Sequence, residues 1–317
     1  MTDLMLLDHI TKIMARGSKS FNNATKLFDP ATRRSVLMLY AWCRHCDDVI
    51  DGQTLGFRSA QSWSEDPKQR LKGLLSQTRQ AYAGLPMSHP AFAAFQRVAL
   101  QHQIPPQLAF DHLKGFEMDV SDTQYTTFDD TLRYCYHVAG VVGLMMAQIM
   151  GVKEAGVLDR ACDLGLAFQL TNIARDLLED AFHKRCYMPT SWLAKEGLDR
   201  HSLTKPIHRP ALARLAAQLI DTAEFYYASA RAGIAMLPLR SAWAVATAHG
   251  VYRQIGIKVR DAGVCAWQAR QQTSRAEKIW FVLSGAFYAL STCYTRAQSR
   301  PPDLWRRPHQ HDADDFY

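Results

Sequence analysis

The sequence contains no hydrophobic run long enough to cross a bilayer. Its longest strongly apolar stretch, residues 279–294, has 16 residues and includes two serines, a glycine and a threonine. A spanning helix needs about 20 consecutive, predominantly apolar residues. We therefore expect this stretch to form a buried helix and not a membrane span.

Cysteine is scarce, and a secretory signal peptide is missing from the opening residues MTDLMLLDHI. The seven cysteines are an odd number without regular spacing, which is typical of reduced thiols in the cytoplasm. Cys43 and Cys46 form a C-x-x-C pair, but no second pair completes a zinc site and no preceding strand supports a redox motif. These absences argue against disulfides and against structural zinc.

Several common catalytic motifs are also missing. The chain has no G-x-S-x-G, H-E-x-x-H or G-x-G-x-x-G, and none of its seven glutamates is followed three positions later by histidine. The last absence excludes a di-iron carboxylate bundle, which requires Glu-x-x-His.

Valine-rich and isoleucine-rich runs with period two are essentially absent, so a β-sheet is not expected. Apolar positions instead recur every three or four residues, within two long blocks that contain no proline, 107–188 and 239–300. The pattern predicts an all-α protein with helices near 4–15, 31–51, 67–83, 90–101, 106–120, 126–150, 153–181, 209–236, 239–262 and 275–296. No low-complexity linker divides the chain, so we expect one domain over 1–308 and a disordered tail over 309–317.

Positive charge is concentrated in the last third of the chain. The net charge is +7, and residues 239–309 contain eleven Lys/Arg against three acidic residues. Such an excess suits an anionic partner, and nucleic acid, an anionic membrane face and a phosphorylated small substrate all qualify. An ordinary solvated basic surface explains the charge equally well.

Two acidic clusters end segments that are otherwise apolar. RHCDDVIDG (44–52) follows SVLMLYAWC, and QLTNIARDLLED (169–180) ends the second segment. Like charges at helical spacing repel each other, so a positive group is expected beside each cluster.

Helical spacing aligns the members of each cluster. Residues four apart on a helix are offset by about 40°. Asp47 and Asp51 therefore share one face, and so do Asn172, Asp176 and Asp180. Magnesium prefers a few carboxylates together with water and substrate phosphates, so two such clusters facing each other would clamp a diphosphate between metal ions.

An arginine precedes each cluster within one turn. A single D-x-x-x-D is more often a solvated helix end, but two of them, preceded by Arg44 and Arg175, favour the metal interpretation. The i+4 spacing also predicts an ion pair between Arg175 and Glu179. Residues 17–20, GSKS, lack the strand and the first glycine of a phosphate loop, yet their hydroxyl and ammonium groups can bind phosphate.

With these segments assembled, the sequence resembles the squalene/phytoene synthase family, and within it the enzymes of bacterial carotenoid pathways. The resemblance spans nearly the whole chain and rests on SKSF (18–21), YAWCRHCDDVID (40–51), YCYHVAGVVG (134–143), LAFQLTNIARDLLED (166–180) and RCYMP (185–189). Both acidic motifs in this order, with the tyrosine-rich helix between them, form a highly specific pattern.

The resemblance implies a fold and a reaction. The fold is a single-domain, isoprenoid-synthase-type helical bundle around a deep apolar cavity, with magnesium-bound diphosphates at its mouth. The reaction is the head-to-head condensation of two geranylgeranyl diphosphates through a cyclopropyl diphosphate to phytoene, with loss of a proton and of two diphosphates. We expect Mg²⁺ or Mn²⁺ and, since no nicotinamide-binding motif is present, no nicotinamide cofactor.

The resemblance also implies roles for individual residues. The implied metal ligands are Asp47, Asp48, Asp51, Asn172, Asp176 and Asp180. The implied diphosphate contacts are Ser18, Lys19, Ser20, Arg44, Asn172, Arg175, Tyr252 and Arg270. Tyr136 or His137 would steer the cation chemistry, with Tyr136 the stronger candidate beside the catalytic aspartates Asp47, Asp51, Asp176 and Asp180. Apolar residues that form either the cavity wall or plain core are Val138, Val141, Leu144, Met145, Leu164, Gly165 and Phe168.

The expected partners are a prenyl diphosphate substrate, a membrane surface that receives the insoluble product, and other carotenoid-pathway enzymes, without nucleic acid. The expected location is cytoplasmic, with peripheral attachment to the inner face of the membrane. Head-to-tail elongation enzymes and terpene cyclases also carry aspartate clusters on helices, and a squalene-type enzyme would need a reductant. A helical scaffold that binds membranes through its basic third remains the non-enzymatic alternative.

Overall fold

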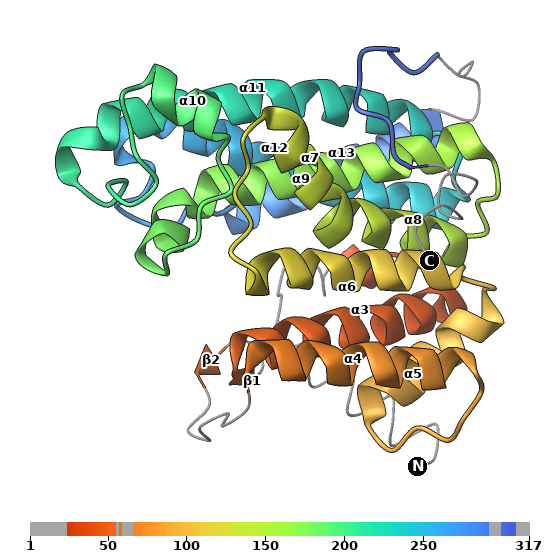
Figure 1. Cartoon of the computed structure of the whole chain (residues 1–317). Helices are drawn as coiled ribbons and strands as arrows, with labels where there is room; N and C mark the ends of the chain where they lie inside the picture. Colours follow the sequence, from red (N-terminus) through yellow and green to blue (C-terminus); the bar gives the residue numbers. More distant parts are fainter. Residues whose placement is uncertain (1–23, 55–56, 59–65, 292–298, 309–317) are drawn as a thin grey trace.

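The computed structural model describes residues 24–54, 57–58, 66–291 and 299–308, and this part of the chain is built almost entirely from helices (Figure 1). The predicted all-α class is therefore confirmed. The long helices are α3 (Pro30–Asp51), α4 (Pro67–Tyr82), α5 (Pro90–Gln101), α6 (Pro106–Val120), α9 (Ala155–Phe182), α11 (Arg209–Ile234), α12 (Leu239–Ala262) and α13 (Arg275–Ser291).

The shorter elements connect these helices. They are α7 (Phe128–Cys135), the π-helix η1 (Tyr136–Gly140), α8 (Val141–Ile149), α10 (Thr190–Lys195) and the 3-10 turns η2 (Pro206–His208) and η3 (Gly263–Cys265). After α3, the two-residue strands β1 (Gln53–Thr54) and β2 (Phe57–Arg58) form an antiparallel hairpin.

Proline and capping side chains determine where the early helices begin. Each of α3, α4, α5 and α6 starts with proline, at a position where the missing N–H has no helical partner to lose. Asp29 caps α3 by accepting hydrogen bonds from the backbone N–H groups of Ala31 and Thr32, both at 3.0 Å. Gly52 ends α3 with φ 65°. The predicted bounds of these four helices hold to within one residue.

Helix α9 is central to one half of the molecule, where it packs against α11, α8, α12 and η1. Helices α3, α4 and α5 lie together on the other side of α6 (Figure 1). One buried core surrounds α7, α9 and α11, and a second lies among α3, α5, α6 and α8. Leu108 and Val142 pack against both cores, so the two halves share a continuous interior.

Two glycines bring α9 into backbone contact with the η1–α8 segment. A Cβ atom at Gly165 would lie 2.4 Å from the carbonyl oxygen of Ala139, and one at Gly143 would lie 2.4 Å from that of Ala161. No side chain fits at either position, so glycine is required for this approach.

Two predicted elements differ from the structure. The helix predicted over 126–150 is interrupted by η1, where π-type hydrogen bonding accommodates an extra residue per turn beside α9. The connection between the helices predicted over 153–181 and 209–236, where no helix was predicted, contains α10. The helix predicted over 4–15, the last residues of the helix predicted over 275–296 and the tail 309–317 lie outside the described residues.

Helix α13 is not buried as the sequence predicted. It packs on α12 through residues that include Phe281 and the small residues Gly285 and Ala289, while five of its larger apolar side chains are exposed. Because α13 is apolar on several faces, its sequence alone could not show which face is covered. Among the helices in the described ranges, none combines the length and the apolar character needed to cross a membrane.

Candidate functional site

A cavity of about 510 Å³ runs between α3, α8, α9, α11 and α12. Polar side chains gather at one end, namely Arg44, Asp47, Asp51, Asp119, Asn172 and Arg185. From this end the lining extends 12 residues along α3, from Asp51 to Leu39, and 15 residues along α9, from Asn172 to Val157. At 1.5 Å per residue these spans correspond to a depth of about 18–23 Å.

The remaining wall is largely apolar. It includes Val138, Val142, Met146, Leu164, Phe168, Ile234, Leu237, Val245 and Ala248, which confirms the predicted deep apolar cavity. Of the residues predicted as wall or core, Val138, Leu164, Gly165 and Phe168 line the cavity. Val141, Leu144 and Met145 are instead buried between helices.

The first acidic cluster occupies the last turns of α3. Asp47 and Asp51 line the cavity, while the buried Asp48 lies beside Arg44. Arg44 binds Asp47 at 3.0 Å and Asp48 at 2.6 Å. The Asp47 side chain is 43% accessible because it faces the cavity. Enclosure by protein nevertheless raises the pKa of Asp47 to about 6, helped by Asp51 and Asp48 and opposed by Arg44.

The second acidic cluster lies along α9, and its arginine pairs differently from the prediction. Arg175 binds Asp176, its neighbour, with Nε 2.9 Å from Oδ1. Arg270 binds both Asp176 at 3.0 Å and Glu179 at 3.1 Å. The predicted Arg175–Glu179 pair is therefore wrong, because Arg270, reaching over from beyond α12, takes Glu179. Burial raises the pKa of Asp180 to about 7, and the neighbouring Asp176 adds to this shift.

Arg185 connects the two clusters across the cavity mouth. It follows α9 in the segment RCYMP and forms an ion pair with Asp51 of α3. Its charge also lowers the pKa of Asp180, against the larger effect of burial. Arg185 had no predicted role, because an isolated arginine after a helix has no spacing signal.

Asp119, at the end of α6, is a second residue that sequence reasoning missed. Its carboxylate accepts hydrogen bonds from the hydroxyls of Tyr187 at 3.0 Å and Tyr134 at 3.3 Å. Burial raises the pKa of Asp119 to about 6, opposed by Arg185. It belongs to no D-x-x-x-D pattern, so only the fold brings it to the mouth.

The structure corrects the position of the predicted aromatic residue. Tyr136 and His137 do not line this cavity; they line a separate hollow, where the Tyr136 hydroxyl donates to Asp111 at 3.0 Å. Tyr134 lines the cavity instead. Tyr134 and Tyr136 are two residues apart, and this spacing puts them on nearly opposite faces of a helix. The available signal was that Tyr134, Val138 and Val142 recur every four residues.

The remaining predicted substrate contacts divide into three groups. Tyr252 lines the cavity and stacks on Phe168 with ring centroids 4.2 Å apart. Arg175 and Arg270 both bind Asp176, one turn along α9 from the lining residue Asn172, and none of these three charged residues lines the cavity. The segment 18–20 lies outside the described residues.

The donor atoms at the mouth suit a hard divalent cation. No three His, Cys, Asp or Glu side chains within the described ranges converge as a preformed metal site. However, the side-chain oxygen Oδ1 of Asn172 is buried without a hydrogen-bond partner. It accompanies carboxylates that share the same helix face, and oxygen donors of this kind fit Mg²⁺ or Mn²⁺. Arginines balance most of the carboxylate charge in the structure.

A protein-family model with the description squalene/phytoene synthase matches residues 14–277. The 15-cis-phytoene synthase of Pantoea ananas is 60% identical over 308 residues, which cover 97% of this chain and 100% of that protein. The phytoene synthase of Pseudescherichia vulneris is 60% identical over 303 residues, covering 96% of this chain and 98% of that protein.

Solved structures show the same fold. A dehydrosqualene synthase in complex with a ligand superposes with a TM-score of 0.79 at 26% identity, covering 91% of this chain and 98% of that one. A squalene synthase from Alicyclobacillus acidocaldarius gives a TM-score of 0.66 at 18% identity, covering 92% and 95% of the two chains. The helical bundle around the cavity is thus shared well beyond close sequence similarity.

Proposed function

This chain belongs to the squalene/phytoene synthase family, and from that premise we propose that it condenses two geranylgeranyl diphosphates head to head to form phytoene. The observation that carries the proposal is the division of one cavity into two environments. Asp47 and Asp51 of the first acidic motif and Asn172 of the second line one end, and mostly apolar side chains line the rest. Such a cavity can hold diphosphates at its mouth and prenyl chains along its length.

The proposed metal ligands are the oxygen donors of the two motifs, namely Asp47, Asp48, Asp51, Asn172, Asp176 and Asp180. Bound Mg²⁺ or Mn²⁺ would supply Lewis-acid stabilisation of the departing diphosphates. The proposed diphosphate contacts are Ser18, Lys19, Ser20, Arg44, Arg175, Tyr252 and Arg270, to which the position of Arg185 adds a further cation. These arginines are placed to exchange a carboxylate partner for a phosphate oxygen.

The chemistry requires a dry cavity with aromatic faces. The first diphosphate leaves with its bonding electron pair, and the resulting allylic cation is attacked by the double bond of the second substrate, which yields a cyclopropyl diphosphate and releases a proton. Loss of the second diphosphate, rearrangement and loss of a second proton then give the hydrocarbon. The apolar wall excludes water from these cations, and the Tyr134 ring at the mouth can stabilise positive charge by about 0.5–2 kcal/mol. Tyr134 thus takes the role that the sequence analysis gave to Tyr136 or His137.

Product analysis tests the reaction. Purified protein is incubated with fifteen-carbon or twenty-carbon prenyl diphosphate and Mg²⁺, with and without reduced nicotinamide cofactor, and the hydrocarbon is identified by chromatography. We expect a forty-carbon conjugated triene and inorganic diphosphate without reductant. Squalene formed only with reductant, or a single elongated diphosphate, would overturn the proposal, and no diphosphate release at all would favour a non-catalytic scaffold.

The same proposal includes peripheral attachment to the inner face of an anionic membrane, where the hydrocarbon product can leave and other enzymes of the carotenoid pathway can receive it. The outward face of α13 supports this part. Five large apolar side chains on that face are between 61% and 75% exposed, namely Ile279, Trp280, Leu283, Phe287 and Leu290. Arg275 and Lys278 flank them in the first turn, and basic residues beside an apolar face favour anionic lipid.

A further inference from the structure

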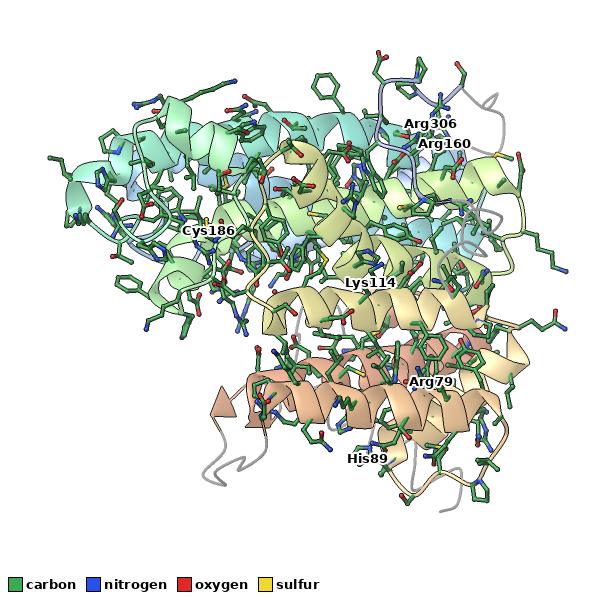
Figure 2. The ribbon with its side chains drawn as sticks, viewed as in Figure 1. Arg79, His89, Lys114, Arg160, Cys186 and Arg306 are labelled. Carbon is green, nitrogen blue, oxygen red and sulfur yellow. The ribbon has the colours of Figure 1, made fainter. Side chains whose placement is uncertain are left out.

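A charged side chain lies near the deep end of the cavity, although most of the wall around it is apolar. Arg160 of α9 lines the cavity far from the carboxylates, one turn nearer the mouth than Val157, and is only 8% exposed. Figure 2 places Arg160 and Cys186, the neighbour of Arg185, at opposite ends of the helical bundle. A buried arginine in this position needs fixed hydrogen-bond acceptors, because its desolvation is costly.

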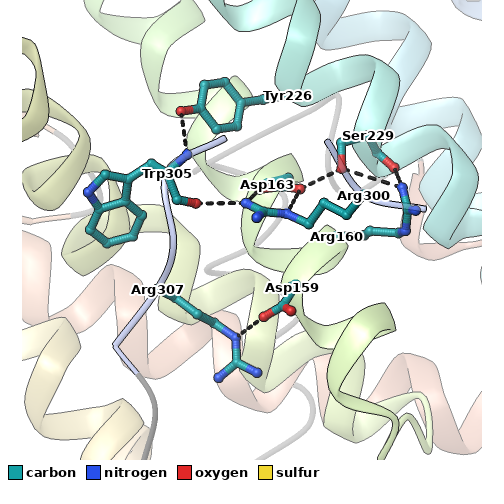
Figure 3. A network of polar contacts seen from close by, with 8 residues as sticks. All are labelled: Asp159, Arg160, Asp163, Tyr226, Ser229, Arg300, Trp305 and Arg307. Carbon is teal, nitrogen blue, oxygen red and sulfur yellow. Dashed lines mark hydrogen bonds and ion pairs between the residues drawn. The ribbon is translucent and has the colours of Figure 1, made fainter. Parts of the chain in front are cut away.

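Ser229 of α11 supplies acceptors for Arg160 (Figure 3). The Nη1 group of Arg160 donates to the carbonyl oxygen of Ser229 at 2.8 Å and to its Oγ at 3.4 Å. The Ser229 hydroxyl in turn donates to Oδ2 of Asp163 at 2.6 Å. Asp163 is completely buried, so its charge must be balanced from nearby.

A C-terminal strap, residues 300–308, balances that charge. Arg300 binds Asp163 through two hydrogen bonds, of 2.8 Å to Oδ2 and 2.7 Å to Oδ1. The same guanidinium donates to the carbonyl oxygen of Trp305 at 2.7 Å, and Arg307 binds Asp159 at 2.6 Å. The strap therefore connects to the first turns of α9 at both of its ends (Figure 3).

The aliphatic stem of Arg160 lies directly against α11. A Cβ atom added at Gly233 would come 2.7 Å from Cβ and 3.1 Å from Cδ of Arg160. Gly233 also lines the cavity, and it lies one turn beyond Ser229. The stem of Arg160 is thus fixed in two ways. It packs tightly against Gly233 of α11, and its guanidinium is bound to the acceptors of Ser229.

From this arrangement we propose that Arg160 limits the room at the deep end of the prenyl-binding cavity and therefore the chain length of the substrate, and that Ser229, Asp163 and Arg300 are positioning residues that hold it in place. The inference rests on the proposed function, because it assumes that prenyl chains lie in the cavity. It adds a claim that the proposed function does not make, namely that a side chain anchored by the C-terminal strap limits the chain length.

The test compares kcat/KM for fifteen-, twenty- and twenty-five-carbon prenyl diphosphates. Replacing Arg160 by alanine removes the stem and deepens the cavity, so we expect the ratio of the twenty-five-carbon to the twenty-carbon value to rise at least about tenfold, the scale of selectivity that apolar pockets achieve. Gly233→Ala should act in the opposite direction, because its methyl group pushes the stem into the cavity and favours the fifteen-carbon substrate.

Arg300 is tested by the same ratio of the twenty-five-carbon to the twenty-carbon kcat/KM. A general loss of folded protein lowers both values and leaves their ratio unchanged. Arg300→Ala should raise the ratio in the direction of Arg160→Ala, and Arg300→Lys, which keeps a cation beside Asp163, should restore it toward the wild-type value. Arg253→Ala is the matched control, because Arg253 forms an exposed ion pair with Glu224 away from the cavity.

The outcomes separate the two proposals. A wild-type protein that condenses none of the three diphosphates refutes the proposed function. An active wild type, with an unchanged ratio in folded Arg160→Ala, refutes the present inference alone. If Arg160→Ala does not fold, Gly233→Ala and the two Arg300 variants test the inference in its place. Unchanged kcat/KM ratios in these variants would also refute the inference about Arg160.

Discussion

Asp180 illustrates how a carboxylate of the second acidic cluster affects folding. Burial raises its pKa to about 7 from the ordinary value of 3.8. The folded chain therefore holds the proton more tightly than the unfolded chain does, so the free energy of unfolding falls as the pH rises from about 4 to 7. In the absence of a bound cation, the ionised form of Asp180 destabilises the fold at neutral pH.

We expect Asp180→Asn to melt a few degrees above the wild type at neutral pH in the presence of a chelator, with the difference vanishing near pH 4. The same variant should lose most of its condensation activity, because asparagine removes a charge needed for metal binding. Thermal unfolding followed by circular dichroism across this pH range, with a diphosphate-release assay, measures both effects.

Glu154→Gln is the control, because Glu154 is exposed before the first turn of the same helix and makes no capping hydrogen bond. A lower melting temperature for Asp180→Asn than for the wild type at neutral pH would contradict the argument.

Sequence spacing predicted some site residues and missed others for a physical reason. Asp47 and Asp51 belong to one helix, so helical periodicity was enough to put them on one face. Asp119 and Arg185 reach the same mouth from other elements. No local sequence pattern shows that residues so far apart in the chain lie close together. The choice between Tyr136 and His137 relied on motif likeness, and both lie outside the cavity. The period-four recurrence of Tyr134, Val138 and Val142 was a better signal.

At the scale of elements, the close contact of α9 with the η1–α8 segment determines the shape of the cavity wall. We expect Gly165→Ala to lower the free energy of unfolding by about 1–3 kcal/mol, the range for overpacking, because its methyl group would meet backbone atoms that cannot rotate away. Urea unfolding measures the change.

Gly156→Ala provides the matched comparison on the same helix, since a Cβ atom there meets nothing within 4 Å. That substitution should leave stability unchanged or slightly higher. Equal losses in the two variants would show that the helix contact is looser than the structure indicates.

Helix bounds were predictable where local chemistry sets them. Asp29 and Pro30 begin α3 and Gly52 ends it, all through interactions within a few residues. The π-turns of η1 were not predictable, because they depend on the approach of α9 from elsewhere in the chain. The outward face of α13 was mispredicted for a related reason: which side of an apolar helix is covered depends on its partner, α12.

At the scale of the whole molecule, the α13 face predicts how the protein meets a membrane. We expect the wild type to sediment with vesicles that contain anionic lipid, to be released by high salt, and not to resist carbonate extraction. A double change of Trp280 and Phe287 to serine should reduce the bound fraction at least about fivefold, since the exposed rings provide much of the apolar contact.

Phe225→Ser is the control, because Phe225 is 67% exposed on α11, outside the α13 face. Binding that survives the double substitution, or that falls equally with Phe225→Ser, would place the contact elsewhere. Protease protection of α13 after carbonate extraction would instead show an inserted segment.

The strap over Asp163 also has a consequence for the order of assembly. Arg300 lies 137 positions after its partner in the chain, so Asp163 remains without this cation until nearly all of the described chain has been synthesised. Contacts between such distant residues form after the local helices, because a long loop must close first. The polar mouth draws on α3, α6 and α9, which emerge earlier. The described residues that line the cavity end at Tyr252, so the ribosome releases the strap that anchors Arg160 only after all of them have been synthesised.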